Sequence, residues 1–241
     1  MIGITMLDYK KVCIIIPAYN EETTIGDVIK ETVKVFSKEE KIRCNIVVVN
    51  DSSSDKTSFI AKKAGAKVIN HILNVGVGGA TATGLSYANQ NDYDIAITMD
   101  ADGQHAPQDA LRGVKIIISK KIDLLIGSRL IDSHGMSKVK IIGNKGLSLV
   151  THLLFGINST DTQSGLRVFS QKALRKLRWK TSGYEFCSEM LWRANQLDLM
   201  IDEYPIKAIY TQYSIQKGQN NWNAINIVKN LLKRRIVEIF E

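Results

Sequence analysis

The chain has 241 residues, which is long enough for one large domain with a full core, and its 44% hydrophobic and 23% charged residues are ordinary for a globular protein. We find neither a signal-peptide pattern nor a run of about 18 apolar residues that would predict a membrane span. The three cysteines, Cys13, Cys44 and Cys187, lack metal-binding or disulfide spacing, so we expect free thiols in a reducing compartment. A net charge of +8 favours an anionic partner, whether nucleic acid, phosphorylated substrate or lipid surface.

The first half of the chain predicts alternating strands and helices. Short β-branched runs indicate buried strands, and amphipathic segments of about ten to fifteen residues indicate the helices between them. We expect strands at residues 12–16, 46–49, 67–69, 94–99 and 123–126, and helices near 24–37, 55–64, 80–89 and 107–119. This alternation is typical of βαβ units with a parallel sheet. We find no repeat or linker and expect a single domain over residues 1–241.

Polar clusters follow four of these predicted strands, at residues 17–22, 50–55, 100–104 and 127–129. In open α/β sheets, ligands bind outside the carboxyl ends of the strands. The clusters therefore predict one substrate site at that edge of the sheet. Ser54 and Asp55 also look like helix N-caps, but capping explains single residues and not the concentration of clusters.

The segment Asp100-Ala101-Asp102 lies at the end of the fourth predicted strand. Buried carboxylates persist only when they are paired or bound to a metal. Oxygen ligands suit Mg²⁺ or Mn²⁺, and Mg²⁺ is typically held by one or two carboxylates together with substrate phosphates. The alternative for an isolated Asp-x-Asp is one capping and one solvated aspartate, which leaves the other polar clusters unexplained.

A glycine cluster occupies residues 74–80, but it differs from a dinucleotide-binding fingerprint. It follows the third predicted strand, and its spacing is not Gly-x-Gly-x-x-Gly. Asp51 could hold a ribose hydroxyl, yet it precedes the glycines, which is the wrong order for a dehydrogenase. We interpret the cluster as backbone that passes close to a ligand or turns tightly into the next helix.

Taken together, the motifs resemble those of the family 2 inverting glycosyltransferases with the GT-A fold. The chain is most similar to the branch of dolichyl-phosphate mannose synthases and dolichyl-phosphate glucosyltransferases, over about residues 12–215. The matching motifs are Pro-Ala-Tyr-Asn-Glu at 17–21, Asn-Asp-Ser-Ser-Ser-Asp-Lys-Thr at 50–57, the glycine cluster at 74–80, Asp-Ala-Asp-Gly-Gln-His-Ala-Pro at 100–107, and Gly-Ser-Arg at 127–129, with support from 161–169 and 183–186. The resemblance implies a single α/β GT-A domain, with a Rossmann-like, mostly parallel sheet flanked by helices. About residues 12–130 would bind the nucleotide-sugar and about 131–241 the acceptor.

The resemblance also implies roles for individual residues. Asn50-Asp51 stands where the branch usually has Asp-Asp, so Asp51 alone would hold the base or ribose of the donor. The residues that would contact the nucleotide-sugar are Pro17, Tyr19, Glu21, Val49, Asp51, Gly78, Asp100, Ala101 and Lys217. Those that would hold Mg²⁺ or Mn²⁺ are Asp100, Asp102 and Gln104, and the acceptor phosphate would meet Arg129 and Arg167. The catalytic residues would be Asp102, Arg129 and Asp161.

The implied reaction is metal-dependent inverting transfer of one mannose, glucose or related hexose from a GDP- or UDP-linked donor to polyprenyl or dolichyl phosphate. A phosphomonoester is largely dianionic at neutral pH and is its own nucleophile, so Asp161 either moves a proton or positions Arg167 or the acceptor. The alternative, transfer from a UDP-sugar to a hydroxyl of a lipid-linked glycan or polysaccharide, needs Asp161 as a base. An Asp-x-Asp phosphohydrolase would carry its nucleophile where Pro17 stands. A non-enzymatic nucleotide-sugar-binding module would not need the metal motif.

Two segments predict contact with a membrane surface. Residues 137–157 and 225–240 place basic side chains beside apolar ones at helical spacing, and such helices can lie in the headgroup plane. The alternative is that both segments pack on the sheet with their lysines solvated. Many relatives continue into transmembrane helices, whereas this chain ends at Glu241. We expect peripheral attachment at the cytoplasmic membrane face, through surface helices or a membrane-anchored partner subunit, and no nucleic-acid partner.

Overall fold

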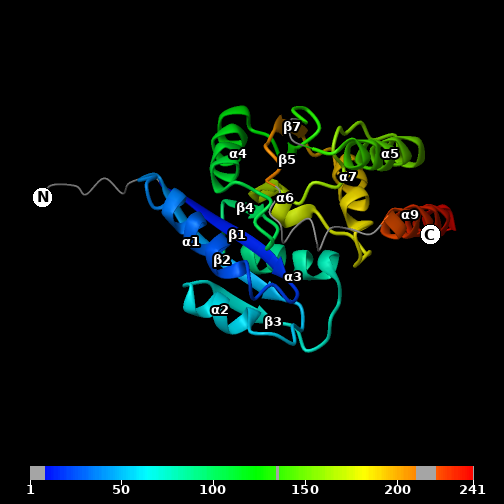
Figure 1. Ribbon diagram of the computed structural model, residues 1–241. Coiled ribbons are helices and arrows are strands. Elements are labelled where there is room, and N and C mark those ends of the chain that lie inside the picture. The colour runs from blue at the N-terminus through cyan, green and yellow to red at the C-terminus, as the bar shows by residue number, and fades with distance from the viewer. Residues whose placement is uncertain (1–8, 134–135, 210–220, 241) are drawn as a thin grey trace, which may run out of the picture.

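The computed structural model describes residues 9–133, 136–209 and 221–240 of the chain. These residues form one α/β domain in which helices cover both faces of a seven-stranded sheet (Figure 1). The strands are β1 (Lys10–Ala18), β2 (Ile42–Asn50), β3 (Lys67–Asn70), β4 (Ile95–Thr98), β5 (Leu124–Ser128), β6 (Arg167–Ser170) and β7 (Ile201–Pro205). The helices are α1 (Ile25–Phe36), α2 (Thr57–Lys63), α3 (Val77–Gln90), α4 (Pro107–Lys120), α5 (Lys138–Phe155), α6 (Gln171–Lys176), α7 (Phe186–Gln196) and α9 (Asn221–Phe240).

The strand order is β3-β2-β1-β4-β6-β5-β7, and β6 runs antiparallel to its neighbours β4 and β5. The other pairs are parallel, so the carboxyl ends of β1 to β4 share one edge of the sheet. The register of β1 and β2 ends at Ala18↔Asn50, which places the first two polar loops next to each other. The predicted α/β fold with a mostly parallel sheet flanked by helices is confirmed.

Strand β1 continues through Pro17, where the apolar run in the sequence ends. Proline has no N–H to donate and is tolerated in a strand where no neighbour needs that donor. The pairing of β1 with β4 ends at Ile15↔Thr98, so β1 has no strand beside it on that side at Pro17. The strand therefore reaches the edge of the sheet and carries its polar loop there.

Alternate residues of β1 contribute to two hydrophobic cores, one on each face of the sheet. Cys13 and Ile15 share a core with residues of α3, α6 and α7. Val12, Ile14 and Ile16 share the other core with residues of α1 and α4. Successive side chains of a strand point to opposite faces, so a continuous apolar run is what a strand covered on both faces requires.

The three cysteines are free thiols, as the sequence predicts. Burial raises the pKa of Cys187 to about 11 and that of Cys44 to about 12, and it raises the pKa of Cys13 further. The thiolate is the reactive form of cysteine. These protonated thiols are therefore packing residues and not nucleophiles.

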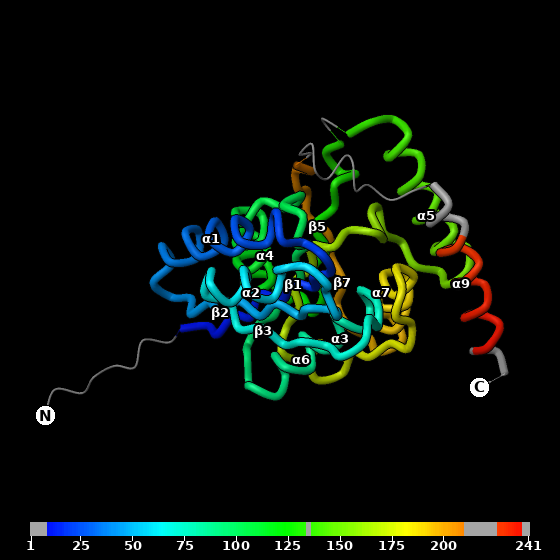
Figure 2. Tube along the Cα trace, turned by 60° about the horizontal axis from the view of Figure 1, so that its bottom comes forward, coloured from blue at the N-terminus to red at the C-terminus, as the bar shows by residue number. Residues whose placement is uncertain are grey.

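Helices α5 and α9 lie side by side at the end of the molecule away from α1 and α2 (Figures 1 and 2). Leu147 and Phe155 of α5 and Ile227 and Leu231 of α9 are buried in the same core. Other apolar residues of both helices remain exposed, so each helix has one packed side and one open side. In the described part of the chain, no helix is long and apolar enough to cross a membrane.

Candidate active site

The loops that follow β1 and β2 are bonded to each other. Glu21 N donates to Thr57 Oγ1 at 2.8 Å, and Ser54 N donates to Asn20 Oδ1 at 2.9 Å. Asp55 Oδ1 accepts from Thr57 N at 2.9 Å, at the start of α2. The N-cap of α2 is Lys56, so neither residue that looks like a cap in the sequence occupies that position. Asp55 bonds the first helical residue, whereas Ser54 bonds to the first loop.

The predicted donor contacts at these strand ends differ in accessibility. Tyr19 is 48% exposed, whereas Glu21 is 9% exposed. Val49 and Ala101 are buried in the cores, so neither presents much accessible surface at this edge. Lys217 lies outside the described residues.

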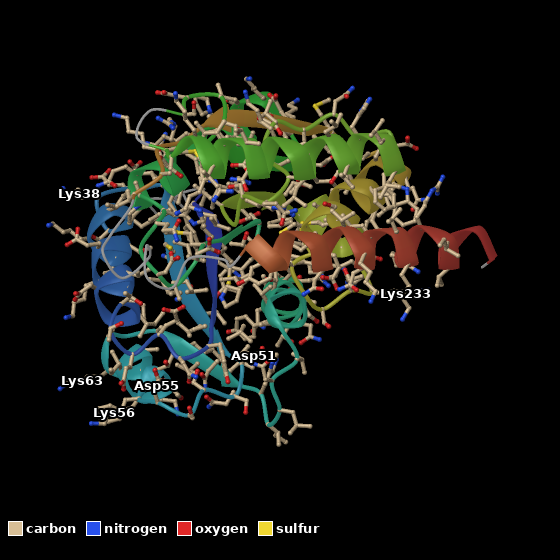
Figure 3. All side chains as sticks on the ribbon, turned by 45° about the vertical axis from the view of Figure 1, so that its right-hand side comes forward. Lys38, Asp51, Asp55, Lys56, Lys63 and Lys233 are labelled. Atoms are coloured by element: carbon tan, nitrogen blue, oxygen red, sulfur yellow. The ribbon has the colours of Figure 1, made fainter. Side chains whose placement is uncertain are left out.

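Asp51 is 3% exposed and organises the loop between β3 and α3. Its Oδ2 accepts from Gly76 N at 2.8 Å, and its Oδ1 accepts from Val75 N at 3.0 Å. Oδ1 also lies 2.7 Å from Nδ1 of His71, whose Nε2 bonds Thr83 Oγ1. Asp51 lies at the start of α3, and Figure 3 shows it apart from Lys63 of α2. The carboxylate that the sequence assigns to the donor nucleoside thus holds the loop beside it.

The glycine cluster makes a close approach between two protein segments. Gly76 has a φ of 87°, and a Cβ there would lie 2.5 Å from the carbonyl oxygen of Ser182. Gly78 N donates to the same oxygen at 2.7 Å, and Trp179 Nε1 donates to Gly78 O at 3.2 Å. The structure shows the tight turn into α3, packed closely against residues 179–182.

Asp100, Asp102 and Gln104 form the turn that follows β4. Gln104 donates to both oxygens of Asp102, from its backbone N at 3.0 Å and from Nε2 at 2.5 Å. Although 44% of the Asp100 side chain is accessible, the surrounding protein desolvates the carboxylate and raises its pKa. The positive charges of Arg129 and Arg167 oppose this rise, and the negative charges of Glu21 and Asp161 add to it. Desolvation and the charge of Asp100 likewise raise the pKa of Asp102.

Two crowded carboxylates with raised pKa values fit a divalent cation, because a cation would relieve both their repulsion and their desolvation. Among the described residues, no three His, Cys, Asp or Glu side chains converge as a complete metal cage. Mg²⁺ commonly keeps one or two carboxylates and takes its other ligands from substrate phosphates and water. The donor set of Asp100, Asp102 and Gln104 fits that kind of site.

His105 packs behind Asp100, and its place in the motif at 100–107 does not by itself predict a role for it. Its side chain is 1% exposed. Nδ1 accepts from Asp100 N at 3.2 Å, and Nε2 lies 3.7 Å from Asp100 Oδ2 without a hydrogen-bond partner. Burial, together with the positive charge of Arg129, lowers the pKa of His105 to about 4, so the imidazole is neutral at pH 7.

Arg129 and Asp161 form a bidentate ion pair. Arg129 Nε donates to Asp161 Oδ2 at 2.7 Å and Arg129 Nη2 donates to Oδ1 at 2.9 Å, while Arg129 N adds a bond to Oδ2 at 3.1 Å. Asp161 is fully buried, whereas 14% of the Arg129 side chain is exposed. Both carboxylate oxygens are therefore engaged in orienting the guanidinium of Arg129, which lies nearer the surface.

Lys140 lies in the first turn of α5, which the sequence predicts only as a basic amphipathic helix. Desolvation lowers its pKa, and the positive charge of Arg129 lowers it further against the opposing pull of Asp102. The Lys140 ammonium therefore interacts electrostatically with both the predicted phosphate-binding arginine and the predicted metal-binding aspartate. The start of α5 brings a second cation towards the same edge of the sheet.

The resemblance predicts that Arg167 meets the acceptor phosphate, but its guanidinium is bonded mainly to backbone carbonyls. The residue is 1% exposed and donates to Thr162 O at 2.7 Å, Ser164 O at 3.0 Å and Cys187 O at 3.3 Å. These bonds fix the segment between Asp161 and β6. In this position the guanidinium of Arg167 is buried and holds the backbone beneath the ion pair of Arg129 and Asp161.

Glu189 of α7 connects the segment behind the glycine cluster to α9. Its carboxylate is fully buried and accepts from Thr181 N at 2.9 Å, Lys180 N at 3.2 Å and Arg234 Nε at 3.1 Å. Burial alone raises the pKa of Glu189, but these hydrogen bonds outweigh it and hold the pKa below its usual value. The carboxylate thus holds the C-terminal helix to the body of the domain.

The amino-acid sequence of the chain is similar to those of sugar-transferring enzymes. The model of glycosyl transferase family 2 matches residues 13–178. The UDP-N-acetylglucosamine–dolichyl-phosphate N-acetylglucosaminyltransferase of Methanococcus voltae is 39% identical over 96% of this chain and 99% of its own length. The undecaprenyl-phosphate mannosyltransferase of Micrococcus luteus is 30% identical over 81% and 82% of the two chains.

Solved structures show the same fold. The crystal structure of glucosyl-3-phosphoglycerate synthase from Mycobacterium tuberculosis superposes with a TM-score of 0.71 and 19% identity, covering 94% of this chain and 80% of the other. That enzyme has also been crystallised with Mn²⁺, UDP-glucose and phosphoglyceric acid. The likeness extends the fold comparison beyond residues 13–178 to nearly the whole chain.

Proposed function

The chain belongs to glycosyl transferase family 2, and on that basis we propose that it transfers one sugar from a nucleotide-sugar to the phosphate of a polyprenyl or dolichyl lipid. The names of the two relatives support this acceptor, since they specify dolichyl phosphate and undecaprenyl phosphate. We assign about residues 12–130 to donor binding and about residues 131–241 to acceptor binding.

The ion pair of Arg129 and Asp161 favours a phosphate acceptor over a hydroxyl acceptor. A hydroxyl acceptor needs a general base within hydrogen-bond reach of its proton. Asp161 is fully buried and both its oxygens accept from Arg129, so it is poorly placed to take a proton. A phosphate acceptor brings an anionic oxygen of its own and needs cations to hold it. Arg129, oriented by Asp161, and Lys140 are the cations that we assign to it.

The donor would lie where the loops after β1, β2 and β4 meet. Asp100, Asp102 and Gln104 would hold Mg²⁺ or Mn²⁺, and a cation bound there neutralises the charge that develops on the leaving nucleoside diphosphate. Tyr19, Glu21 and the loop anchored by Asp51 would border the nucleoside. The 39% identity with the enzyme of Methanococcus voltae makes UDP-N-acetylglucosamine the first donor to test, ahead of UDP-glucose and GDP-mannose.

The open sides of α5 and α9 would dock on the cytoplasmic face of the membrane. Their exposed apolar residues are Val139, Ile142, Leu149 and Leu153 in α5 and Leu232, Ile236 and Val237 in α9. Basic side chains accompany them, including Lys138, Lys145 and Lys233, the last of which projects from α9 in Figure 3. Basic amphipathic helices bind anionic lipid surfaces in this way. Lys140, at the start of α5, would then face the lipid phosphate.

Radiolabelled sugar transfer to dolichyl phosphate, compared with dolichol, tests the proposal. The full chain is incubated with each acceptor in detergent and Mn²⁺, using the three donors in turn. We expect transfer to dolichyl phosphate alone, from one preferred donor, and loss of transfer with EDTA. Equal transfer to dolichol, or to neither acceptor from any donor, would refute the proposed acceptor.

A further inference from the structure

His105 has one ring nitrogen in use and one without a partner. Because Nδ1 accepts a hydrogen bond from Asp100 N, a ring proton must lie on Nε2. Nε2 is buried and has no partner in the described part of the chain. A buried N–H without a partner is costly, so its presence in a fold calls for an explanation.

The ring cannot turn easily to find another partner. The backbone of His105 forms an antiparallel bridge with Ala208, and Ile209 N donates to Gln104 O at 3.1 Å. These contacts hold the turn that carries His105 against the segment that follows β7. The backbone of the turn is thus fixed, and the bond from Asp100 N to Nδ1 together with the burial of the side chain sets the direction of Nε2.

Asp100 Oδ2 lies 3.7 Å from Nε2, which is just beyond hydrogen-bond distance. The Asp100 carboxylate also lies against Gly165, where an added Cβ would come within 2.6 Å of Asp100 Cγ. The Gly165 backbone thus bounds the carboxylate on one side, and the imidazole lies beside it. A small rotation would bring one of its oxygens into a hydrogen bond with Nε2–H.

We propose that His105 is a positioning residue for Asp100, whose carboxylate gives one oxygen to Nε2–H when the cation and the nucleotide are bound. The other oxygen then faces the ligand. The inference rests on the proposed function, because it concerns the same site, but it adds a residue that acts through Asp100 without touching the donor. Partners that hydrogen-bond to metal ligands typically change metal affinity by about 10–100-fold when they are removed.

Two substitutions separate positioning from a merely structural role. His105→Asn keeps an acceptor near the place of Nδ1 for Asp100 N but does not reach the carboxylate. His105→Gln places an amide N–H near the position of Nε2. Mn²⁺ binding is measured by electron paramagnetic resonance on the full chain with saturating UDP, or with GDP if GDP alone stabilises the wild type. We expect His105→Asn to weaken Mn²⁺ binding by about 10–100-fold and His105→Gln to stay closer to the wild type.

A measurement on the unaltered protein covers the case in which a variant fails to fold. With ¹⁵N-labelled histidine, the Nε2–H resonance of His105 should move downfield and exchange more slowly when Mg²⁺ and the nucleotide are added. An unchanged resonance, or equal Mn²⁺ affinity in wild type and His105→Asn, would overturn the inference while leaving the proposed function intact. Absence of any nucleotide or Mn²⁺ binding by the wild type would instead overturn both.

Discussion

Replacing Gly165 by alanine tests whether the position of the Asp100 carboxylate controls the reaction. A Cβ on Gly165 would lie 2.6 Å from Asp100 Cγ, whereas non-bonded carbon atoms prefer about 3.5–4.0 Å. The carbonyl oxygen of Gly165 accepts from Thr98 Oγ1 at 2.8 Å, which holds the Gly165 backbone in place. We therefore expect the carboxylate to move, by roughly 1 Å, and the backbone to stay.

The effect on turnover should be much larger than the effect on stability. Misplacing a group at a reaction centre by about 1 Å can cost about 10²-fold in rate, or about 2.7 kcal/mol. Overpacking of a closed core costs about 1–3 kcal/mol of stability. Here 44% of the Asp100 side chain is accessible, so the carboxylate can swing towards solvent and the loss of stability should lie at or below the lower end of that range.

The assay compares turnover at saturating donor, Mn²⁺ affinity and urea unfolding for Gly165→Ala and for a control, Gly146→Ala. Gly146 lies on the exposed side of α5, where an added Cβ meets nothing within 4 Å. The control should gain about 0.5–1 kcal/mol of stability and keep the Mn²⁺ affinity of the wild type. Wild-type turnover and Mn²⁺ affinity in Gly165→Ala would refute the reasoning, as would a loss of turnover that partial unfolding explains fully.

Three further predictions follow from the buried charges. Asp102→Asn should weaken Mn²⁺ binding yet raise the melting temperature of the ligand-free protein at pH 7. The raised pKa of Asp102 means that its ionised form destabilises the fold. Calorimetry should therefore show that the stability gained by the variant shrinks as pH falls and vanishes below the ordinary pKa of 3.8. A variant less stable than the wild type at pH 7 would contradict this. Asp161→Asn should lower turnover with dolichyl phosphate by less than about 10²-fold and raise the acceptor KM, since Arg129 loses part of its anchor, whereas a loss of about 10²–10⁴-fold would identify Asp161 as a base. Arg234→Met and Glu189→Gln should each cost about 1–3 kcal/mol in chemical denaturation, and the double variant less than their sum, because both remove the same ion pair; additive costs would show that the pair is not coupled.

Local sequence patterns were sufficient for the central strands. The apolar runs ending at Ile16, Val49 and Met99 correspond to β1, β2 and β4, because strands buried on both faces are continuous apolar runs. The pattern gave no sign of β6 and β7, since Arg167–Ser170 and Ile201–Pro205 are short and carry charged residues. Their strand conformation depends on pairing with β4 and β5, which lie far away in the sequence.

The grouping of the polar loops also followed from the sequence, because parallel order brings the carboxyl ends of strands to one edge. Which of these side chains contact each other did not follow from the sequence. Asp161 meets Arg129 across 32 residues, and Gly165 lies against Asp100, because antiparallel β6 is inserted between β4 and β5 and carries the preceding segment into the site. The carboxylate of Asp51 likewise accepts hydrogen bonds from backbone amides of a later loop. Residue type and strand order therefore determined which side chains gather at the edge, while long-range packing alone decided which of them touch, since a hydrogen bond depends on positions to within a fraction of an ångström.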